Sequence, residues 1–153
     1  MKHIFIIGSR GLPAKYGGFE TFVEELVKHQ INKNIKYHVA CQSENSTLAK
    51  AGAHFEYFNA DCYTIKVPNI GTARVIAYDC LAINTALQII KEKQIHAPVF
   101  IILGNTIGGL ISHFAKKIHA IGGTLFVNPD GLEWKRTKWS APVRRYLKYA
   151  EQK

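Results

Sequence analysis

The stretch from Gly8 to Gly18 is the most distinctive candidate for chemistry in the sequence. It holds four glycines and Pro13 within eleven residues, and its last two residues, Gly17 and Gly18, stand directly before a segment with helical spacing. Glycine lets a ligand approach the backbone closely, and the free N–H groups at the start of a helix attract an anion. The pattern predicts a site for a phosphorylated ligand, although turn geometry alone accounts for the glycines about equally well.

Charged residues in and after this stretch fit the same chemistry. Arg10 and Lys15 can neutralise a phosphate, and Glu20 can accept a hydrogen bond from a ligand hydroxyl held over the glycine pair. Each residue also has a simpler interpretation. The two cations can be solvated loop charges, and an acid in the first turn of a helix stabilises the helix dipole by ~0.3–1 kcal/mol.

Two further loops follow apolar, strand-like runs. The loop from Gly104 to Gly109 repeats the strand-to-helix glycine pattern and contains Asn105 and Thr106, although glycines there can equally serve tight helix packing. The segment from Asn128 to Trp139 is denser in polar and aromatic residues than a connection requires, and its Asp130 follows a buried strand. Ligands of open parallel sheets lie outside the carboxyl ends of the strands, so all three loops are expected to border one site.

Several other kinds of site are disfavoured by spacing. The first glycine loop matches neither G-x-G-x-x-G nor G-x-x-x-x-G-K-[ST], which argues against a nicotinamide dinucleotide site and a P-loop. The seven histidines show no H-E-x-x-H and no cysteine at ligand spacing, so no metal site is expected. No G-x-S-x-G elbow for a hydrolase is present. Cys41, Cys62 and Cys80 are expected to be core residues rather than nucleophiles.

Positive charge is concentrated at the C-terminal end. Lys and Arg number 20 against 11 Asp and Glu, which gives a formal net charge of +9. Residues 130–153 contribute seven basic and three acidic residues, interleaved with Trp134, Trp139, Tyr146 and Tyr149. Such a surface can bind nucleic acid, an anionic membrane or a phosphorylated ligand, or it can be a solvated helix that serves solubility.

Apolar runs and helical spacing alternate along the chain. With 153 residues, 47% of them hydrophobic, the chain is expected to form one domain with a real core. Strands are predicted at residues 4–7, 37–41, 54–58, 63–67, 99–103 and 124–127, and helices at 19–31, 72–93, 110–120 and from 140 onward. The longest helix is expected to pack on two faces. This order predicts an α/β fold with a doubly wound, mainly parallel sheet, in a Rossmann-like three-layer αβα domain.

Cysteine usage and apolar segments indicate the compartment. Three widely spaced cysteines without a secretory segment predict a reduced, cytoplasmic protein. The uncharged stretch 94–115 contains Pro98 and several glycines, so strand, loop and helix are expected there rather than a membrane span. Residues 146–153 keep a helical pattern without a stop signal, and further protein is expected beyond them.

Two long motifs carry a resemblance to a known family. The first runs GSRGLPAKYGGFETFVEEL from Gly8 to Leu26, and the second runs NPDGLEWKRTKWS from Asn128 to Ser140. Together they resemble the N-terminal domain of bacterial rhamnosyltransferases of glycosyltransferase family four, and the similarity spans essentially the whole chain. In that family two Rossmann-like domains face each other across a cleft. The N-terminal domain holds the acceptor, and the C-terminal domain holds the nucleotide-sugar.

The resemblance implies a function for the whole chain. Residues 1–153 would be the acceptor-side domain, and the donor-binding C-terminal domain is absent, so the chain alone is expected to be inactive. The implied reaction transfers a sugar, such as rhamnose from dTDP-rhamnose, to a lipid-linked saccharide in capsule or cell-wall polysaccharide synthesis, with no metal or other cofactor. The implied location is cytoplasmic and peripheral on the anionic inner face of the cell membrane. Nucleic acid is not an expected partner.

The family motifs also imply roles for individual residues. Gly17 and Gly18 match the glycine pair that approaches the donor diphosphate and sugar, with Arg10 and Lys15 as further donor-binding candidates. Glu20 matches the acid after the glycine pair. Asp130 lies where many relatives place a histidine or aspartate near the reacting sugar, and no histidine role transfers here. Glu20 and Asp130 are therefore the catalytic candidates. The acceptor-binding candidates are Asn105, Thr106, Glu133, Lys135 and Arg136.

Two other classes compete with this function. A basic Rossmann-like module that binds nucleic acid or another anion would account for the charge but not for the glycine loops, and no RNA- or DNA-binding motif is present. A nucleotide-dependent oxidoreductase would lack its dinucleotide fingerprint.

Overall fold

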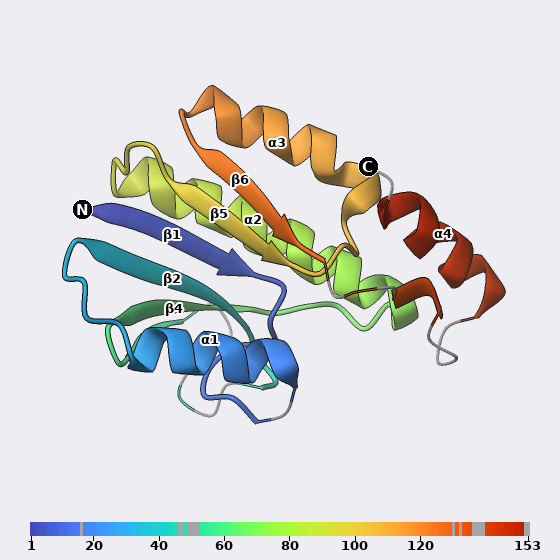
Figure 1. Cartoon of the computed structure of the whole chain (residues 1–153), viewed down its shortest axis with the longest axis horizontal. Coiled ribbons are helices and arrows are strands. Elements are labelled where there is room, and N and C mark those ends of the chain that lie inside the picture. Colours follow the sequence, from blue (N-terminus) through green and yellow to red (C-terminus); the bar gives the residue numbers. More distant parts are fainter. Residues whose placement is uncertain are drawn as a thin grey trace.

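A six-stranded sheet forms the middle layer of the computed structural model, and helices cover both of its faces (Figure 1). The structure describes residues 1–15, 17–45, 48, 53–129, 131, 133–135 and 140–151. The strands are β1 (Lys2–Ile7), β2 (Ile35–Gln42), β3 (His54–Tyr57), β4 (Ala60–Ile65), β5 (Val99–Leu103) and β6 (Thr124–Asn128). The α-helices are α1 (Gly18–Lys28), α2 (Arg74–Glu92), α3 (Ile111–Ala120) and α4 (Ala141–Glu151), and the short 3-10 helices are η1 (Gly71–Ala73), η2 (Gly108–Leu110) and η3 (Glu133–Lys135).

The sheet has the strand order β3-β4-β2-β1-β5-β6. All neighbours are parallel except β3 and β4, which form an antiparallel hairpin. The predicted strand at 63–67 begins earlier, at Ala60, because residues 58–59 form the tight turn of that hairpin. The chain passes from β1 to one side of the sheet and later enters β5 on the other, so the strand order reverses between β1 and β5. The predicted doubly wound, mainly parallel Rossmann-like fold is confirmed.

Separate apolar cores lie on the two faces of the sheet. Alternate residues of a strand point to opposite faces, and in β1 Phe5 and Ile7 pack with residues of α2 and α3 while Ile6 packs with residues of α1. Cys41 and Cys62 are buried in the core under α1, as the sequence predicted. The central strands of this parallel sheet are buried on both faces, which requires the continuous apolar runs from which they were predicted. The expectation that Asp130 follows a buried strand is wrong, because β6 is an edge strand whose Phe126 and Val127 are 57% and 42% exposed.

α1 ends earlier than its apolar pattern predicts. It stops at Lys28, and Ile31, expected on its apolar face, is 93% exposed. The His29 N–H closes the helix on the Glu25 carbonyl. Asn32 then accepts a hydrogen bond from the Asn34 N–H, a local side-chain bond that favours a turn over further helix.

α2 buries one face, so the expectation of two packed faces is wrong. Tyr78, Ile83 and Ile90 lie in the core, whereas Val75 and Leu81 are 39% and 40% exposed. By length and composition alone, the segment Gly71–Glu92 is long and apolar enough to cross a membrane. In this fold its buried side packs against the sheet. A core helix of an αβα domain needs such an apolar composition for that packing. The stretch 94–115 forms β5, η2 and the first half of α3, as predicted.

α4 occupies a different position from the other α-helices. It lies across the end of the sheet to which the arrowheads of β1, β5 and β6 point, together with η3 (Figure 1). This is the carboxyl edge, where the loops after the strands meet. α4 contacts both η2 and η3. The C-terminal part of the chain therefore covers the loop region that the sequence singled out.

Candidate functional site

The carboxyl edge between β1 and β5 is the candidate site. The loop after β1 leads to α1 on one face, and the loop after β5 leads to η2 and α3 on the other face. Open α/β sheets bind their ligands at such a reversal of strand order. The two strands also meet closely here, since a Cβ at Gly8 would collide with the Leu103 carbonyl oxygen. That contact fixes the two loops relative to each other.

Two carboxylates of α1 hold the loop after β1. Glu20, 7% exposed, accepts a hydrogen bond from the Arg10 N–H at 2.7 Å, and Glu24 accepts one from the Ala14 N–H at 3.2 Å. Sequence reasoning offered Glu20 either as a ligand acceptor or as a helix-dipole acid. The structure adds a third role, because both acids tie the loop to the helix that follows it.

The middle of this loop is packed onto the sheet. Leu12 is buried, and its N–H donates to the Cys41 sulfur at 3.4 Å. Gly11 has a φ of +111°, and a Cβ there would collide with Cys41. The Leu12–Pro13 peptide bond is cis. The contacts with Cys41 therefore hold the middle of the loop against β2.

The glycine pair at the end of the loop has two different roles. Gly17 has a φ of +121°, and a Cβ there would collide with the Glu20 carboxylate. Gly18, the first residue of α1, has no atom of the described residues within 4 Å of its Cβ position. No side chain in the described part of the chain caps this helix. Within the described residues its first N–H groups therefore have no side-chain partner, and Gly18 adds no side chain that would keep an anion away from them.

Arg10 and Lys15 are exposed on the same loop. Neither forms an ion pair with a carboxylate among the residues that the structure describes. Both cations are exposed to solvent on the loop that leads to α1. Their role in binding phosphate stays a prediction.

Buried polar atoms without partners lie beside these loops. Asp79 of α2 is 1% exposed, and its Oδ2 accepts a hydrogen bond from the Thr106 hydroxyl at 2.6 Å. Asp79 Oδ1, the Ser9 hydroxyl and both amide atoms of Asn105 have no partner within the described residues. Buried polar groups are almost always paired, so water or ligand atoms are expected to complete these hydrogen bonds.

Asp79 is the one acid among these buried polar residues, and its pKa is shifted. Burial raises the pKa of Asp79 to about 7, and the hydrogen bond from Thr106 opposes that shift only in part. The neighbouring Tyr78 hydroxyl lies 2.7 Å from the Ser9 carbonyl oxygen and 2.8 Å from that of Ala40, so it can donate to either. We did not predict Asp79 or Ser9 from the sequence. The available signal was a single acid inside the apolar pattern of the longest helix.

A cavity of about 480 Å³ opens at Asn105. Its walls are mostly apolar residues of β6, η2 and α3, with Asn105 and Glu151 as polar members. α4 closes one side, where the Tyr146 hydroxyl donates to the Thr106 carbonyl at 2.8 Å. Asn105 therefore lies in the wall of a space that can hold a ligand, with both of its amide atoms buried, whereas the Thr106 hydroxyl is already bound to Asp79.

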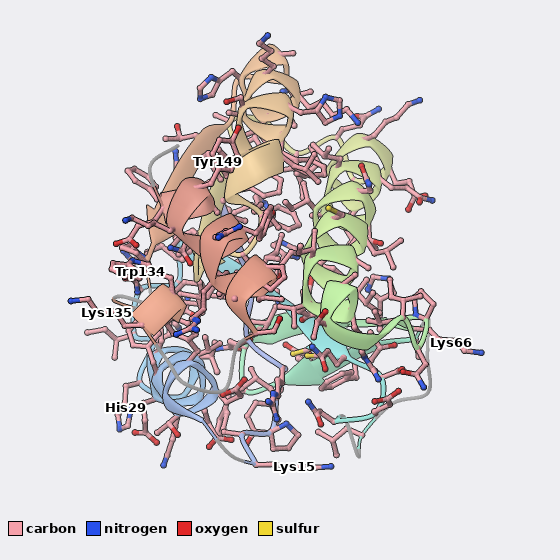
Figure 2. All side chains as sticks on the ribbon, turned by 90° about the vertical axis from the view of Figure 1, so that its right-hand side faces the viewer. Lys15, His29, Lys66, Trp134, Lys135 and Tyr149 are labelled. Atoms are coloured by element: carbon pink, nitrogen blue, oxygen red, sulfur yellow. The ribbon has the colours of Figure 1, made fainter. Side chains whose placement is uncertain are left out.

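A second pocket, of about 430 Å³, lies between η3 and α4 and is called the η3–α4 pocket below. It is lined by Trp134, Lys135, Ala141, Arg144, Arg145 and Lys148. Figure 2 looks onto the carboxyl edge and shows Trp134 and Lys135 projecting from η3 beside α4. The predicted basic and aromatic surface is thus present, and Lys135 belongs to it.

The remaining predicted residues are only partly placed. Asp130 and Arg136 lie outside the described residues, and for Glu133 only its position in η3 is described. Their roles stay predictions. Within the described part of the chain, no group of three or more His, Cys, Asp or Glu side chains is arranged to hold a metal ion.

The sequence matches the sequence model of one protein family over its whole length. The family is described as a domain of unknown function, DUF1972, and its model matches residues 1–153. The chain belongs to the DUF1972 family. No curated protein matches the sequence. The glycine loops, the buried polar atoms and the η3–α4 pocket all lie within the DUF1972 domain, and any function for it has to be argued from them.

Proposed function

We propose that the DUF1972 domain is the acceptor-side half of a glycosyltransferase. The reaction would move a sugar, such as rhamnose from dTDP-rhamnose, to a lipid-linked saccharide in polysaccharide synthesis. One observation carries the proposal: a pre-organised glycine loop presents Gly18 and the uncapped N-terminus of α1 at the reversal of strand order. The resemblance of the two long motifs to rhamnosyltransferases supports the same reaction.

The chemistry assigns a task to each part of this loop. Glycosyl transfer from a nucleotide-sugar releases a diphosphate, whose growing negative charge must be stabilised. The N-terminus of α1 supplies partial positive charge, and the exposed Arg10 and Lys15 supply full charges nearby. Gly18 lets the diphosphate come close to the backbone.

Sugar hydroxyls need hydrogen-bond acceptors in the same place. One oxygen of Glu20 holds the Arg10 N–H, and the other lies at Gly17, beside the open end of the helix. In the proposal this second oxygen accepts a sugar hydroxyl, and Asp130 supplies the other carboxylate near the reacting sugar. Asn105, in its cavity, orients the acceptor, together with Thr106, Glu133, Lys135 and Arg136. No metal or cofactor takes part.

The partners of the domain follow from this reaction. A second, donor-binding domain would face the carboxyl edge, and the basic surface of η3 and α4 would rest on anionic lipid at the cytoplasmic face of the membrane. Binding to phosphatidylglycerol vesicles should then be strong at low salt and weak at high salt. Absence of binding at low salt would remove the membrane from the proposal.

Glu20 provides the main test, in a polypeptide that carries this domain together with the donor-binding domain. Glu20→Ala removes both the loop contact and the hydroxyl acceptor, and we expect kcat/KM for sugar transfer to fall by roughly 100-fold or more. Glu20→Gln keeps an oxygen for the Arg10 N–H but loses the charge, so it should fall less. Glu25→Ala is the control, because Glu25 is half exposed and, among the described residues, its carboxylate pairs only with Lys28 and His29 at the surface. Near-normal transfer by a folded Glu20→Ala variant would contradict the assignment.

Gly18 provides a second test with a smaller structural effect. Because its Cβ position is open in the described structure, Gly18→Ala should fold normally. The added methyl group would nevertheless stand between the diphosphate and the helix N-terminus. We expect a higher KM for the nucleotide-sugar with unchanged thermal stability. An unchanged KM would show that the donor does not approach α1.

A binding module for nucleic acid or another polyanion is the second candidate. The unpaired cations of the η3–α4 pocket favour it. A gel-shift assay with single- and double-stranded nucleic acid separates the two, since the transferase should give no discrete complex at physiological salt.

A further inference from the structure

We infer that the η3–α4 pocket is a specific binding site for a phosphate or diphosphate group. The inference rests on the proposed function for the origin of the bound phosphate, because a lipid-linked acceptor carries such a group. It goes further in placing that group in one pocket, instead of on a diffuse basic surface. The lining side chains, their charges and their attachment to the carboxyl edge carry it.

The lining of the pocket is cationic. Lys135 comes from η3, and Arg144, Arg145 and Lys148 come from α4, with Trp134 between the two elements. No carboxylate is among the lining residues that the structure describes. A volume of about 430 Å³ is in the range of small-molecule sites, and it exceeds what a phosphate alone would fill.

Trp134 holds two of the cations in position. The ammonium of Lys135 lies 5.4 Å from the centroid of the Trp134 ring, and that of Lys148 lies 5.2 Å from it. Cation–π attraction at this range stabilises both side chains in the conformation that brings them together. Two like charges gathered on one ring repel each other. An anion bound between them would remove that repulsion.

Among the described residues, the pocket carries an excess of positive charge. None of the four forms an ion pair with a described carboxylate, whereas Lys36, Lys93 and Arg74 elsewhere in the fold each have one. Residues 130–153 contain seven basic and only three acidic residues, so their own carboxylates cannot balance them. An external anion can supply the counter-charge that the described carboxylates do not.

The pocket is fixed relative to the candidate site. Tyr146 of α4 donates to the Thr106 carbonyl, and Gly108 of η2 packs so tightly on α4 that a Cβ would collide with Ala150. These contacts come from the loop after β5, which carries Asn105. A phosphate held by α4 would therefore stand at a constant distance from the Asn105 cavity.

The residue types favour phosphate over a monovalent carboxylate. Arg144 and Arg145 offer planar guanidinium groups that bind two oxygens at once, and the two lysines add compact charges. A phosphate monoester or a diphosphate has enough oxygens and charge for several such partners. The lipid phosphate of an acceptor and a free soluble phosphate share this chemistry, and the experiment separates them.

The first arm measures binding of inorganic diphosphate by titration calorimetry to the 153-residue chain. We expect binding at the η3–α4 pocket to be weakened by roughly 10-fold or more in Arg144→Ala and in Arg145→Ala, whereas any diphosphate bound at the N-terminus of α1 should be unaffected by these variants. Lys116→Ala and Lys117→Ala on α3 are the controls, because they remove the same charge from another helix. Trp134→Leu keeps every charge and should weaken binding, because the lysines lose their shared ring. No diphosphate binding, or equal losses in the α3 controls, would overturn the inference.

The second arm distinguishes the source of the phosphate. Phosphatidylcholine vesicles doped with a polyprenyl diphosphate should bind the chain more tightly than vesicles of equal charge made with phosphatidylglycerol. Inorganic diphosphate should compete. Binding of diphosphate without any preference for these vesicles assigns the site to a soluble phosphate. Displacement of diphosphate by single-stranded RNA in a discrete complex would overturn the inference in favour of a nucleic-acid surface.

These assays do not depend on sugar transfer. If diphosphate binds as expected and transfer is absent, only the proposed function fails. If transfer occurs and Arg144→Ala leaves both the acceptor KM and diphosphate binding unchanged, only the pocket assignment fails. The expected result is a raised acceptor KM in Arg144→Ala with little change in kcat.

Discussion

Buried polar atoms without partners among the described residues gather at the carboxyl edge of the sheet, whereas the opposite edge has one of them, Gln30 Oε1 beside the first residue of β2. At the carboxyl edge, Asp79 Oδ1 and both amide atoms of Asn105 are buried without partners among the described residues. In the amino-terminal half of the sheet, the ring of the buried His38 has one hydrogen-bond partner, His3, and one nearby carboxylate, that of Asp61. His3 Nδ1 lies 2.9 Å from His38 Nε2, and Asp61 lies 3.6 Å from His38 Nδ1. Satisfied polar groups stabilise a fold, whereas unsatisfied ones mark where something else binds.

Burial also moves one titratable group at each edge toward its neutral form. It raises the pKa of Asp79 to about 7 and lowers the pKa of His38 to about 4. At His38 the Asp61 carboxylate opposes the shift, and the charges of His3, Lys93 and Lys36 add to it. The contributions of the two edges to the free energy of unfolding should therefore change with pH in opposite directions.

The largest expected effect is at Asp79. Its folded pKa lies above the unfolded value of 3.8, so the free energy of unfolding should fall as pH rises from about 4 to about 7 and then stay level. The full change is of the order of 4 kcal/mol. Asp79→Asn keeps an oxygen for the Thr106 hydroxyl but cannot ionise. It should be more stable than the wild type at pH 8 and nearly equal at pH 4, by urea unfolding. Parallel stability curves would show that Asp79 is not buried as described.

His38 should give a somewhat smaller effect of opposite sign. Its folded pKa lies below the unfolded 6.5, so the free energy of unfolding should fall as pH decreases from 6.5 to about 4, by roughly 3 kcal/mol. His38→Gln should flatten this acid limb. The pKa of His3 is also lowered by burial, so a remnant of the slope should persist. His119→Gln, on the exposed side of α3, is the control, and an equal flattening there would remove the special role of His38.

The fold was predictable because its signals are local and redundant. Each buried strand is a continuous apolar run, and each of the first two long loops is marked by glycine. The errors have physical causes that the pattern does not contain. Ile31 continues the spacing of α1, but the side chain of Asn32 makes a turn instead. Phe58 continues β3 in composition, but it has a φ of +50° in the hairpin turn.

Only the parts of the candidate site that depend on backbone geometry were predictable from the sequence. Gly17 stood out because its φ of +121° favours glycine, and Gly18 because it leaves the first residue of α1 without a side chain. Asp79 did not, since an acid in a helix is usually exposed, and only the tertiary fold places it against Thr106. Likewise the sequence showed basic and aromatic residues together, but the meeting of Lys135 and Lys148 on one Trp134 ring depends on how η3 packs on α4.

Within the carboxyl edge, the two glycines of the pair should differ in how much they contribute to stability. Gly17→Ala places a side chain at a φ of +121° and against Glu20, and we expect a loss of ~1–3 kcal/mol in unfolding free energy. Gly18→Ala has neither problem, and alanine favours a helix, so stability should stay level or rise by up to ~1 kcal/mol. Urea midpoints of the two variants measure this directly. Equal losses would mean that both glycines serve the fold, and Gly18 would lose its reason to be a ligand contact.

The smallest expected effect is at the junction of α4 with the carboxyl edge. Tyr146→Phe removes only the hydroxyl that donates to the Thr106 carbonyl, so the free energy of unfolding should fall by ~1 kcal/mol. Amide hydrogen exchange should become faster in α4 and η2. Tyr57→Phe loses a comparable hydrogen bond, at 2.6 Å to Glu24, but on the α1 side, so exchange in α4 should not change. If α4 exchanges equally fast in both variants, Tyr146 does not couple α4 to the loop after β5. The η3–α4 pocket would then have to hold its phosphate independently of the site at the strand ends.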